Sequence, residues 1–141
     1  LAAPRVDTRL RERFFGDFER TDTANYQRVW SLDNIDARQT QFGCESTEQV
    51  LIRLLALIRE LESNLSQKKI VLVSHGDPLQ ILEAWFSGLP CNAHRQLRPL
   101  KNAELRFLRE NIKREASLPE NEVAVQEKII REPNRYGYDN F

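Results

Sequence analysis

Apolar residues recur at helical spacing between Glu45 and Ser66, and this stretch is the clearest element of the sequence. Polar residues fill the positions between them, as expected for a helix with one buried face. Ser46 and Gln49 stand at the N-cap and N3 positions of a capping box, in which each side chain bonds the other residue's backbone N–H. We therefore predict an amphipathic helix that packs on a sheet. Its apolar face comprises Val50, Leu51, Leu54, Leu55, Ile58, Leu61 and Leu65.

A continuous apolar run, Ile70–Val73, follows this helix and ends at Ser74-His75-Gly76. Three of its four residues are β-branched, which favours a short buried strand. Asp77 is a suitable N-cap for a second helix, which we predict from Pro78 to about Ser87. Alternation over Asn102–Leu108 predicts a further strand. A helix, a turn and a buried strand form half of a βαβ unit, so we expect an α/β fold.

The segments between these elements show no clear helical or strand periodicity. Leu10–Glu19 is predicted to be a loop whose three phenylalanines fill the core, with Gly16 free to take a positive φ. Arg20–Gly43 is polar and turn-rich, with a short helix expected near Tyr26–Trp30. Leu89–Leu100 is predicted to be a loop.

The length of 141 residues suits one domain, which we place at residues 1–110. Residues 111–141 are highly charged, and we predict a C-terminal extension that lies on the domain or is partly disordered.

Charge and composition exclude several classes of protein. Lys plus Arg and Asp plus Glu number 21 each, so no global field favours nucleic acid or an anionic membrane. No apolar run approaches the roughly 18 residues of a membrane span, and no secretory segment is present, so we expect a cytoplasmic protein. Cys44 and Cys91 form no CxxC pair, which fits free thiols. Cys91 and His94 have the spacing of two metal ligands, but no second pair stands nearby and no metal site is expected.

Two residues are candidates for chemistry. His75 follows a predicted strand and precedes a helix, where unpaired N–H groups and the helix dipole favour an anion such as phosphate. The alternative is that His75 only caps the strand through a backbone hydrogen bond. Glu12 stands between Arg11 and Arg13 and before two aromatic rings, so it is either a surface charge or a carboxyl group with a tuned pKa. Burial would raise that pKa and the arginines would lower it.

Three segments together resemble the histidine phosphatase superfamily, the phosphoglycerate mutase-like group. They are Leu10-Arg11-Glu12-Arg13-Phe14-Phe15-Gly16, Gly43-Cys44-Glu45-Ser46 and Val73-Ser74-His75-Gly76-Asp77. The resemblance covers about Val6 to Leu108, and Asn102-Ala103 resembles the family's last conserved strand. It implies a three-layer α/β sandwich with a mostly parallel sheet, whose first strand and helix are missing from this chain.

The resemblance also implies roles. Glu12 would protonate the leaving oxygen and later act as general base, and His75 would stabilise the charge of the transferring phosphoryl group. The substrate-binding positions would be Arg13, Phe15, Gly76 and Asp77, the last through its backbone N–H.

The family's nucleophile is a different histidine, in an Arg-His-Gly segment that this sequence lacks. His94, the only other histidine, matches no family motif. Either the chain is a fragment or the natural protein has lost its nucleophile. We favour a fragment, because Glu12 and His75 remain in their motifs. Since the missing strand is central in the family's sheet, residues 1–141 are expected to fold poorly or associate, and to show no turnover.

The family's mutases carry features that are absent here. The position of the mutases' lysine, a few residues past the Glu motif, lies near Thr23 in this sequence, and Phe15 stands where they have a tyrosine. Where the mutases have paired arginines, Arg20–Gly43 has only the isolated Arg28 and Arg38. These differences favour a phosphomonoester hydrolase that acts through a phosphohistidine. Mutase-like phosphoryl transfer and a non-catalytic remnant that binds phosphate or protein stay as alternatives.

The expected partners are a small phosphorylated substrate and a second copy of the chain, without nucleic acid or membrane. No cofactor is expected, because histidine, arginine and helix N–H groups can meet the phosphoryl charge.

Overall fold

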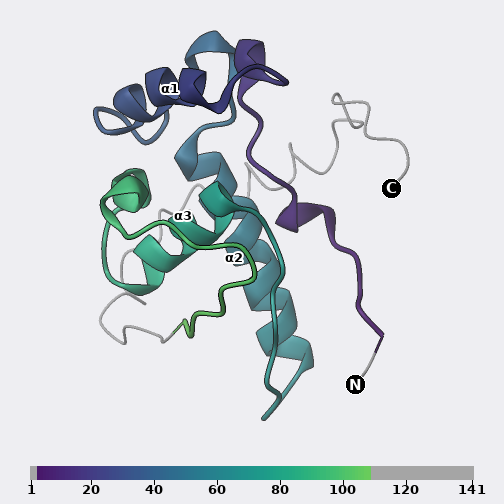
Figure 1. Cartoon of the computed structure of the whole chain (residues 1–141). Helices are drawn as coiled ribbons and strands as arrows, with labels where there is room; N and C mark the ends of the chain where they lie inside the picture. Colours follow the sequence, from purple (N-terminus) through teal and green to yellow (C-terminus); the bar gives the residue numbers. More distant parts are fainter. Residues whose placement is uncertain (1–2, 109–141) are drawn as a thin grey trace. The chain divides into compact units, whose positions relative to one another are not determined.

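The computed structural model of the chain describes residues 3–108. Within this range it contains the α-helices α1 (Tyr26–Asp33), α2 (Thr47–Asn64) and α3 (Gly76–Phe86), drawn in Figure 1. Short 3-10 helices lie before, between and after them: η1 (Thr8–Leu10), η2 (Gly16–Phe18), η3 (Thr23–Asn25), η4 (Gln41–Gly43) and η5 (Cys91–Gln96). All described residues belong to one compact unit, Leu1–Asn111. The predicted extension, residues 111–141, lies outside the described residues.

Helix α2 forms as its sequence predicts. The capping box is present: the Gln49 N–H donates to Ser46 Oγ at 3.1 Å, and the Ser46 N–H donates to Gln49 Oε1 at 2.8 Å. This exchange satisfies two donors that a helix start otherwise leaves unpaired. The apolar face of α2 packs on α3 and η5, whereas we had predicted that it packs on a sheet. The shared core consists of Val50, Leu51, Leu54, Leu55, Ile81, Leu82 and Cys91.

Helix α3 begins two residues earlier than predicted. His75, and not Asp77, is its N-cap, with extended backbone angles and no hydrogen bond from its side chain to the helix. Pro78 remains compatible with the first turn, because N–H groups there have no intrahelical acceptor.

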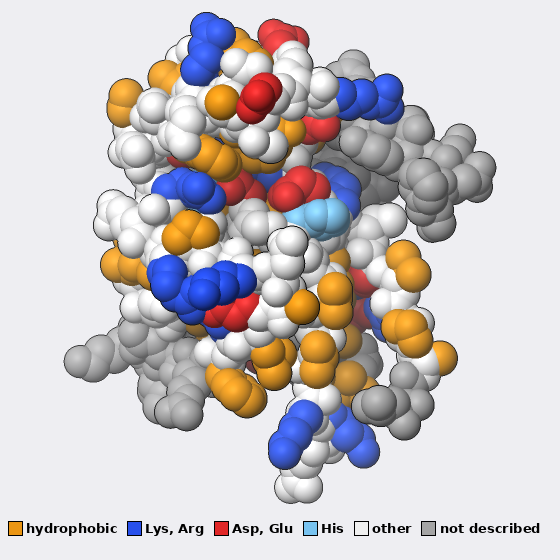
Figure 2. Space-filling model, in the orientation of Figure 1, with side chains coloured by type: hydrophobic (Ala, Val, Ile, Leu, Met, Phe, Trp, Pro, Cys, Tyr) orange, Lys and Arg blue, Asp and Glu red, His pale blue; other side chains and the backbone are white. Residues whose placement is uncertain are grey.

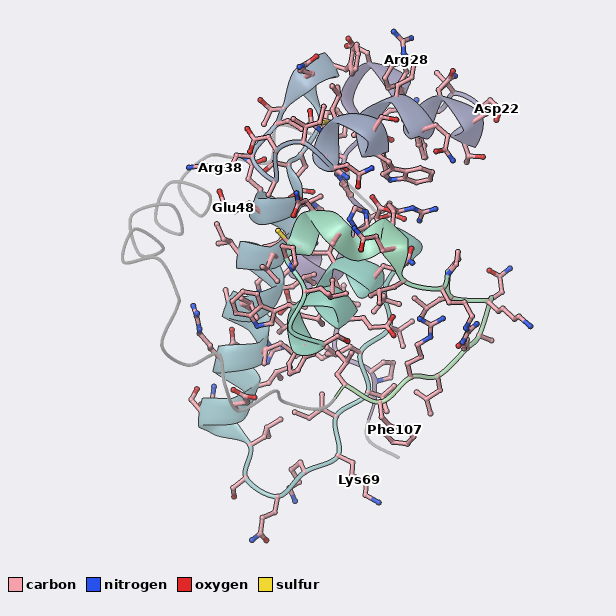
Figure 3. The ribbon with its side chains drawn as sticks, turned by 90° about the vertical axis from the view of Figure 1, so that its left-hand side faces the viewer. Asp22, Arg28, Arg38, Glu48, Lys69 and Phe107 are labelled. Atoms are coloured by element: carbon pink, nitrogen blue, oxygen red, sulfur yellow. The ribbon has the colours of Figure 1, made fainter. Side chains whose placement is uncertain are left out.

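The predicted parallel sheet, and with it the three-layer α/β sandwich, is wrong for the described residues: residues 3–108 contain no strand. Both segments predicted as strands are irregular, and most of their apolar side chains face solvent, although Leu72 and Leu108 pack against the core shared by α2 and α3. Val71 and Val73 are 70% and 80% exposed, and Phe107 is 85% exposed. Figure 2 shows hydrophobic side chains reaching the surface in the lower half of the view, and Figure 3 places Phe107 and Lys69 at the same end of the unit.

The reason is that a strand needs a neighbour. A helix satisfies its N–H and C=O groups within one segment, whereas a strand must exchange them with a second extended segment. The β-branched composition of Ile70–Val73 favours a buried strand. A strand also needs a neighbouring strand to pair with, and the described part of the chain contains none.

A second, smaller core forms around Phe15, Val29 and Cys44. Phe15 stacks on the ring of Tyr26 from α1, with centroids 3.9 Å apart and planes 4° from parallel. The prediction that aromatic residues of the 10–19 loop fill the core is confirmed for Phe15, which is 3% exposed.

Gly16 takes a φ of +61°, as its glycine allows. A Cβ atom at this position would lie 1.9 Å from the carbonyl oxygen of Phe42. The loop that carries Glu12 and the turn η4 are therefore in direct backbone contact.

No helix within residues 3–108 combines the length and the apolar character needed to cross a membrane.

Candidate functional site

The structure brings Glu12 and His75 together, although 63 positions separate them along the chain. Glu12 Oε2 lies 3.9 Å from His75 Nδ1, close enough for the charges to interact but too far for a hydrogen bond. Both side chains reach solvent, with exposed fractions of 41% and 58%. In Figure 2, acidic, basic and histidine side chains gather in a band across the middle of the view.

The pKa of Glu12 is raised to about 7, chiefly by burial and in part by the nearby carboxylates of Asp77 and Glu19. The backbone N–H of Arg13, which donates to Glu12 Oε1 at 2.8 Å, and the charge of Arg53 oppose this shift. The sequence left open whether burial or the arginines would dominate, and burial does. A carboxyl group with a pKa near neutrality populates both protonation states, as general acid–base catalysis requires.

The arginines that flank Glu12 in sequence pair with other carboxylates. Arg11 lies 3.0 Å from Glu45 Oε1, and Arg13 pairs with Asp33 through both of its terminal nitrogens at 2.6 and 2.8 Å. Each of these arginines is therefore paired with another carboxylate, and the charge of Arg53 from α2 opposes the raised pKa of Glu12.

The backbone of the Glu12 segment is held from two sides. Arg53 is buried and donates to the carbonyl oxygens of Arg9 and Glu12, the latter at 3.3 Å. Ser74 Oγ donates to the carbonyl oxygen of Leu10 at 2.6 Å. Helix α2 and the residue that precedes His75 thus both fix the segment that carries Glu12.

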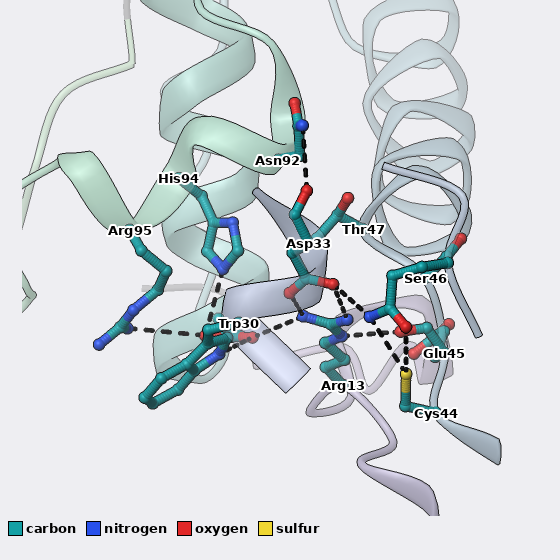
Figure 4. Close-up of polar contacts among 12 residues, drawn as sticks. Arg13, Trp30, Asp33, Cys44, Glu45, Ser46, Thr47, Asn92, His94 and Arg95 are labelled. Carbon is teal, nitrogen blue, oxygen red and sulfur yellow. Dashed lines mark hydrogen bonds and ion pairs between the residues drawn. The ribbon is translucent and has the colours of Figure 1, made fainter. Parts of the chain in front are cut away.

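The side chain of Arg13 is fully buried. Figure 4 shows it beside Asp33, with dashed lines marking its polar contacts. Besides Asp33, its Nε donates to the carbonyl oxygen of Glu45 at 2.7 Å, and its Nη1 donates to Asp77 Oδ2 at 3.3 Å. The predicted contact of Arg13 with substrate stays a prediction, because its guanidinium is occupied by protein groups in this structure. Asp33 was missed, since a lone aspartate at the end of α1 carries no sequence signal.

The carboxylate of Asp77 is the meeting point of a buried polar cluster. Trp30 Nε1 donates to its Oδ2 at 3.0 Å, while His94 Nε2 and Arg95 Nη1 lie 3.6 and 3.7 Å from its Oδ1. Burial alone would raise the pKa of Asp77, but His94, Arg13 and Trp30 hold it below its ordinary value. The group is therefore an anion inside the protein.

His94 was missed as a structural residue because its spacing matches no motif. It is fully buried, and its Nδ1 donates to the carbonyl oxygen of Cys91 at 3.1 Å. Its Nε2 faces the Asp77 carboxylate and has no hydrogen-bond partner within 3.5 Å among the described residues.

The remaining predicted site residues lie at different depths. Phe15 is buried in the aromatic stack, away from solvent. Gly76 opens α3, and a Cβ built on it would meet no atom within 4 Å. Its N–H and that of Asp77 belong to the first turn, where a helix leaves its donors unpaired and favours negative charge. Binding of a substrate at Phe15, Gly76 and Asp77 stays a prediction.

No group of three His, Cys, Asp or Glu side chains within residues 3–108 is arranged to hold a metal ion. Cys44 and Cys91 are buried and free, and burial raises the pKa of both thiols.

Comparison with known proteins adds one finding. A family model described as the histidine phosphatase superfamily (branch 1) matches residues 2–118, which confirms the resemblance of the three segments. No curated protein and no solved structure matches the chain.

Proposed function

The chain belongs to the histidine phosphatase superfamily, and on this premise we propose that it supplies the acid–base and phosphate-clamping half of a phosphomonoester hydrolase site. The observation that carries the proposal is the position of Glu12, a carboxyl group with a pKa of about 7, at 3.9 Å from a histidine that caps a helix N-terminus. One group can exchange a proton near neutral pH, and the other stands where a phosphate is favourably bound.

In the first step, the P–O bond of the ester breaks and a P–N bond forms to a nucleophilic histidine. Protonated Glu12 gives its proton to the leaving alkoxide oxygen, which departs as an alcohol. In the second step, ionised Glu12 takes a proton from water, the water oxygen attacks phosphorus and the P–N bond breaks. His75 and the N–H groups of Gly76 and Asp77 stabilise the negative charge of the phosphoryl oxygens in both steps.

The nucleophile of this scheme is not in the sequence. In the superfamily that histidine belongs to an Arg-His-Gly segment, and neither histidine of this chain stands in one. His94 is buried against Asp77 and cannot reach a substrate without a rearrangement. The proposed enzyme therefore takes its nucleophile from residues outside these 141, and the chain alone is expected to be inactive.

Two arginines of the 20–43 segment support hydrolysis over mutase-like transfer. Arg28 lies 5.1 Å from the ring centroids of Phe18 and Phe42, and Arg38 is exposed beside Asp36. Figure 3 shows Arg28 and Arg38 well apart, so they form no paired grip for a substrate carboxylate. Mutase-like phosphoryl transfer remains the second candidate, and rapid transfer between phosphoglycerates would favour it.

The test has two parts. A natural protein that contains this chain and an Arg-His-Gly segment should hydrolyse p-nitrophenyl phosphate, and Glu12→Gln and His75→Ala should each abolish the activity. The 141-residue chain should show no turnover but should bind inorganic phosphate, with NMR shifts at the amides of Gly76 and Asp77 that His75→Ala removes. Turnover by the 141-residue chain that survives His94→Ala would overturn the proposal, because it would require a nucleophile of another kind.

A further inference from the structure

A buried ion pair joins the two segments that form the candidate site. Glu12 is followed directly by Arg13, and His75 stands two positions before Asp77. Arg13 Nη1 donates to Asp77 Oδ2 at 3.3 Å, and both side chains are buried. The distance between Glu12 and His75 is therefore tied, through their neighbours, to a contact that solvent does not reach.

Asp77 also differs from an ordinary acidic residue at a helix start. Such residues commonly bond the backbone N–H groups of their own helix. Among the described residues, the Asp77 carboxylate accepts hydrogen bonds from Arg13 and Trp30 and from no N–H of α3. The donors of the first turn are thus not used by this side chain and stay free for a ligand.

The charge of Asp77 is unfavourable for the function proposed above. A carboxylate within the first turn of α3 opposes a phosphate bound at the same turn, and it already raises the pKa of Glu12. The contacts of the Asp77 carboxylate must therefore explain why a buried anion is present so close to the proposed phosphate site. Its neighbours come from three other parts of the unit: Arg13 from the Glu12 segment, Trp30 from α1, and His94 and Arg95 from η5.

We propose that the Asp77 carboxylate is a positioning group, which fixes the first turn of α3 against the Glu12 segment so that His75 and the Gly76 and Asp77 amides remain aligned with Glu12. This inference rests on the proposed function. It assigns to the Asp77 side chain a role separate from phosphate binding by its backbone N–H. Trp30 supports this position by donating to Oδ2 of Asp77, and His94 Nε2 lies 3.6 Å from the other oxygen.

The substitution Asp77→Asn separates position from charge, because the amide has nearly the same shape without the negative charge. If Asp77 only added charge near the site, its removal would strengthen phosphate binding. If Asp77 positions the first turn, the amide NH₂ group of asparagine would face the N–H donors of Arg13 or Trp30. The lost hydrogen bond would disturb the alignment and weaken phosphate binding. The two explanations therefore predict opposite signs.

Asp33→Asn is the matched control. Asp33 also accepts from Arg13 and is equally buried, with side-chain exposures of 1% against 3% for Asp77. It lies at the end of α1 and belongs to neither site segment. A general loss of stability will appear in both variants, whereas only Asp77→Asn alters the direct contact between α3 and the Glu12 segment.

The experiment measures the dissociation constant of inorganic phosphate for the 141-residue chain from the NMR shift of the Gly76 amide. We expect Asp77→Asn to weaken binding about tenfold, which corresponds to about 1.4 kcal/mol. Asp33→Asn should lower the denaturation midpoint and leave phosphate affinity within about twofold. Unchanged or tighter phosphate binding by Asp77→Asn would overturn the inference.

A second variant and a second measurement guard against misfolding and against a site that binds no phosphate. Trp30→Phe removes one donor to Asp77 and leaves every charge in place, and it should weaken phosphate binding about threefold. Hydrogen exchange of the Leu79 N–H, which bonds the His75 carbonyl oxygen at 3.1 Å, should be faster in Asp77→Asn than in Asp33→Asn at equal global stability. Equal exchange in both variants refutes the positioning role, whereas a wild-type chain that binds no phosphate refutes the proposed function alone.

Discussion

Helix α2 and the segment Ile70–Val73 carry the same kinds of apolar residue but bury them to very different degrees. Leu54 of α2 is 1% exposed, whereas Val73 is 80% exposed. Helix α2 completes its backbone hydrogen bonds within itself and needs only one surface to pack on. The segment at 70–73 also needs a partner strand for its backbone, which the described residues do not supply, and among its side chains only Leu72 packs against the core. Apolar composition thus predicts that a segment needs to be buried. Whether the segment can be buried in this chain depends on whether its backbone hydrogen bonds can form locally.

The largest difference in unfolding free energy should appear when side chains of the two regions are shortened to alanine. Leu54→Ala removes side-chain atoms from the core shared with α3 and should lower the free energy of unfolding by about 3 kcal/mol. Val71→Ala, at a side chain that is 70% exposed, should change it by less than about 0.5 kcal/mol. Urea denaturation followed by circular dichroism measures both. Equal losses would mean that residues 70–73 are buried in solution.

The local character of α2 can be tested at its cap. Ser46→Ala removes the acceptor of the Gln49 N–H and should cost about 1 kcal/mol of unfolding free energy. Ser63→Ala near the end of the same helix, where the hydroxyl only donates to the Glu60 carbonyl oxygen, should cost less than about 0.5 kcal/mol. If both substitutions cost the same in urea denaturation, the capping box does not define the start of α2.

Burial of a charge, unlike burial of an apolar group, makes stability depend on pH. The pKa of Glu12 is raised from 4.5 to about 7 on folding, so the folded protein keeps a proton that the unfolded chain releases. The contribution of Glu12 to stability is therefore present below about pH 4.5 and is lost as the pH rises to about 7. Because the side chain is 41% exposed, solvent screening should keep the loss below about 1 kcal/mol.

Glu12→Gln should remove this part of the pH dependence, which urea denaturation of both proteins between pH 4 and 8 would show as a difference that grows with pH. Parallel curves would show that burial does not raise the pKa of Glu12.

The smallest effect on stability is expected from a charge in the exposed segment. Val73→Lys should change the free energy of unfolding by less than about 0.5 kcal/mol, yet it should reduce self-association, because exposed apolar edges pair with other chains. Sedimentation velocity over a concentration series should show association of the wild-type chain and a monomeric variant. A wild-type chain that is monomeric at every concentration and unfolds cooperatively would contradict the expectation of association.

Local signals explain which parts of the fold could be predicted. Ser46 and Gln49 are three positions apart, so the start of α2 is encoded within one turn and was predicted correctly. His75 displaced Asp77 as the N-cap of α3 because the Asp77 side chain turns to Arg13 and Trp30, which are distant in sequence. The strands failed for a related reason, since pairing partners are not visible in the segment itself.

The candidate site divides in the same way. Glu12 and His75 were singled out by short motifs, and the structure places them 3.9 Å apart. Asp33 and His94 were missed because each acts through a partner at least 17 positions away, Arg13 for the first and Asp77 for the second. Motifs therefore predict the groups that meet solvent, and the buried network that holds them must be read from the structure.

The contact between Gly16 and Phe42 has a consequence for genetic screens. Any side chain at position 16 would need to displace the backbone of η4, and it would do so four residues from Glu12. Substitutions of Gly16 should therefore appear among inactive variants as often as those of Glu12, although the residue has no group that could bind or react. In a list of loss-of-function positions, folding yield would distinguish the glycine from the acid.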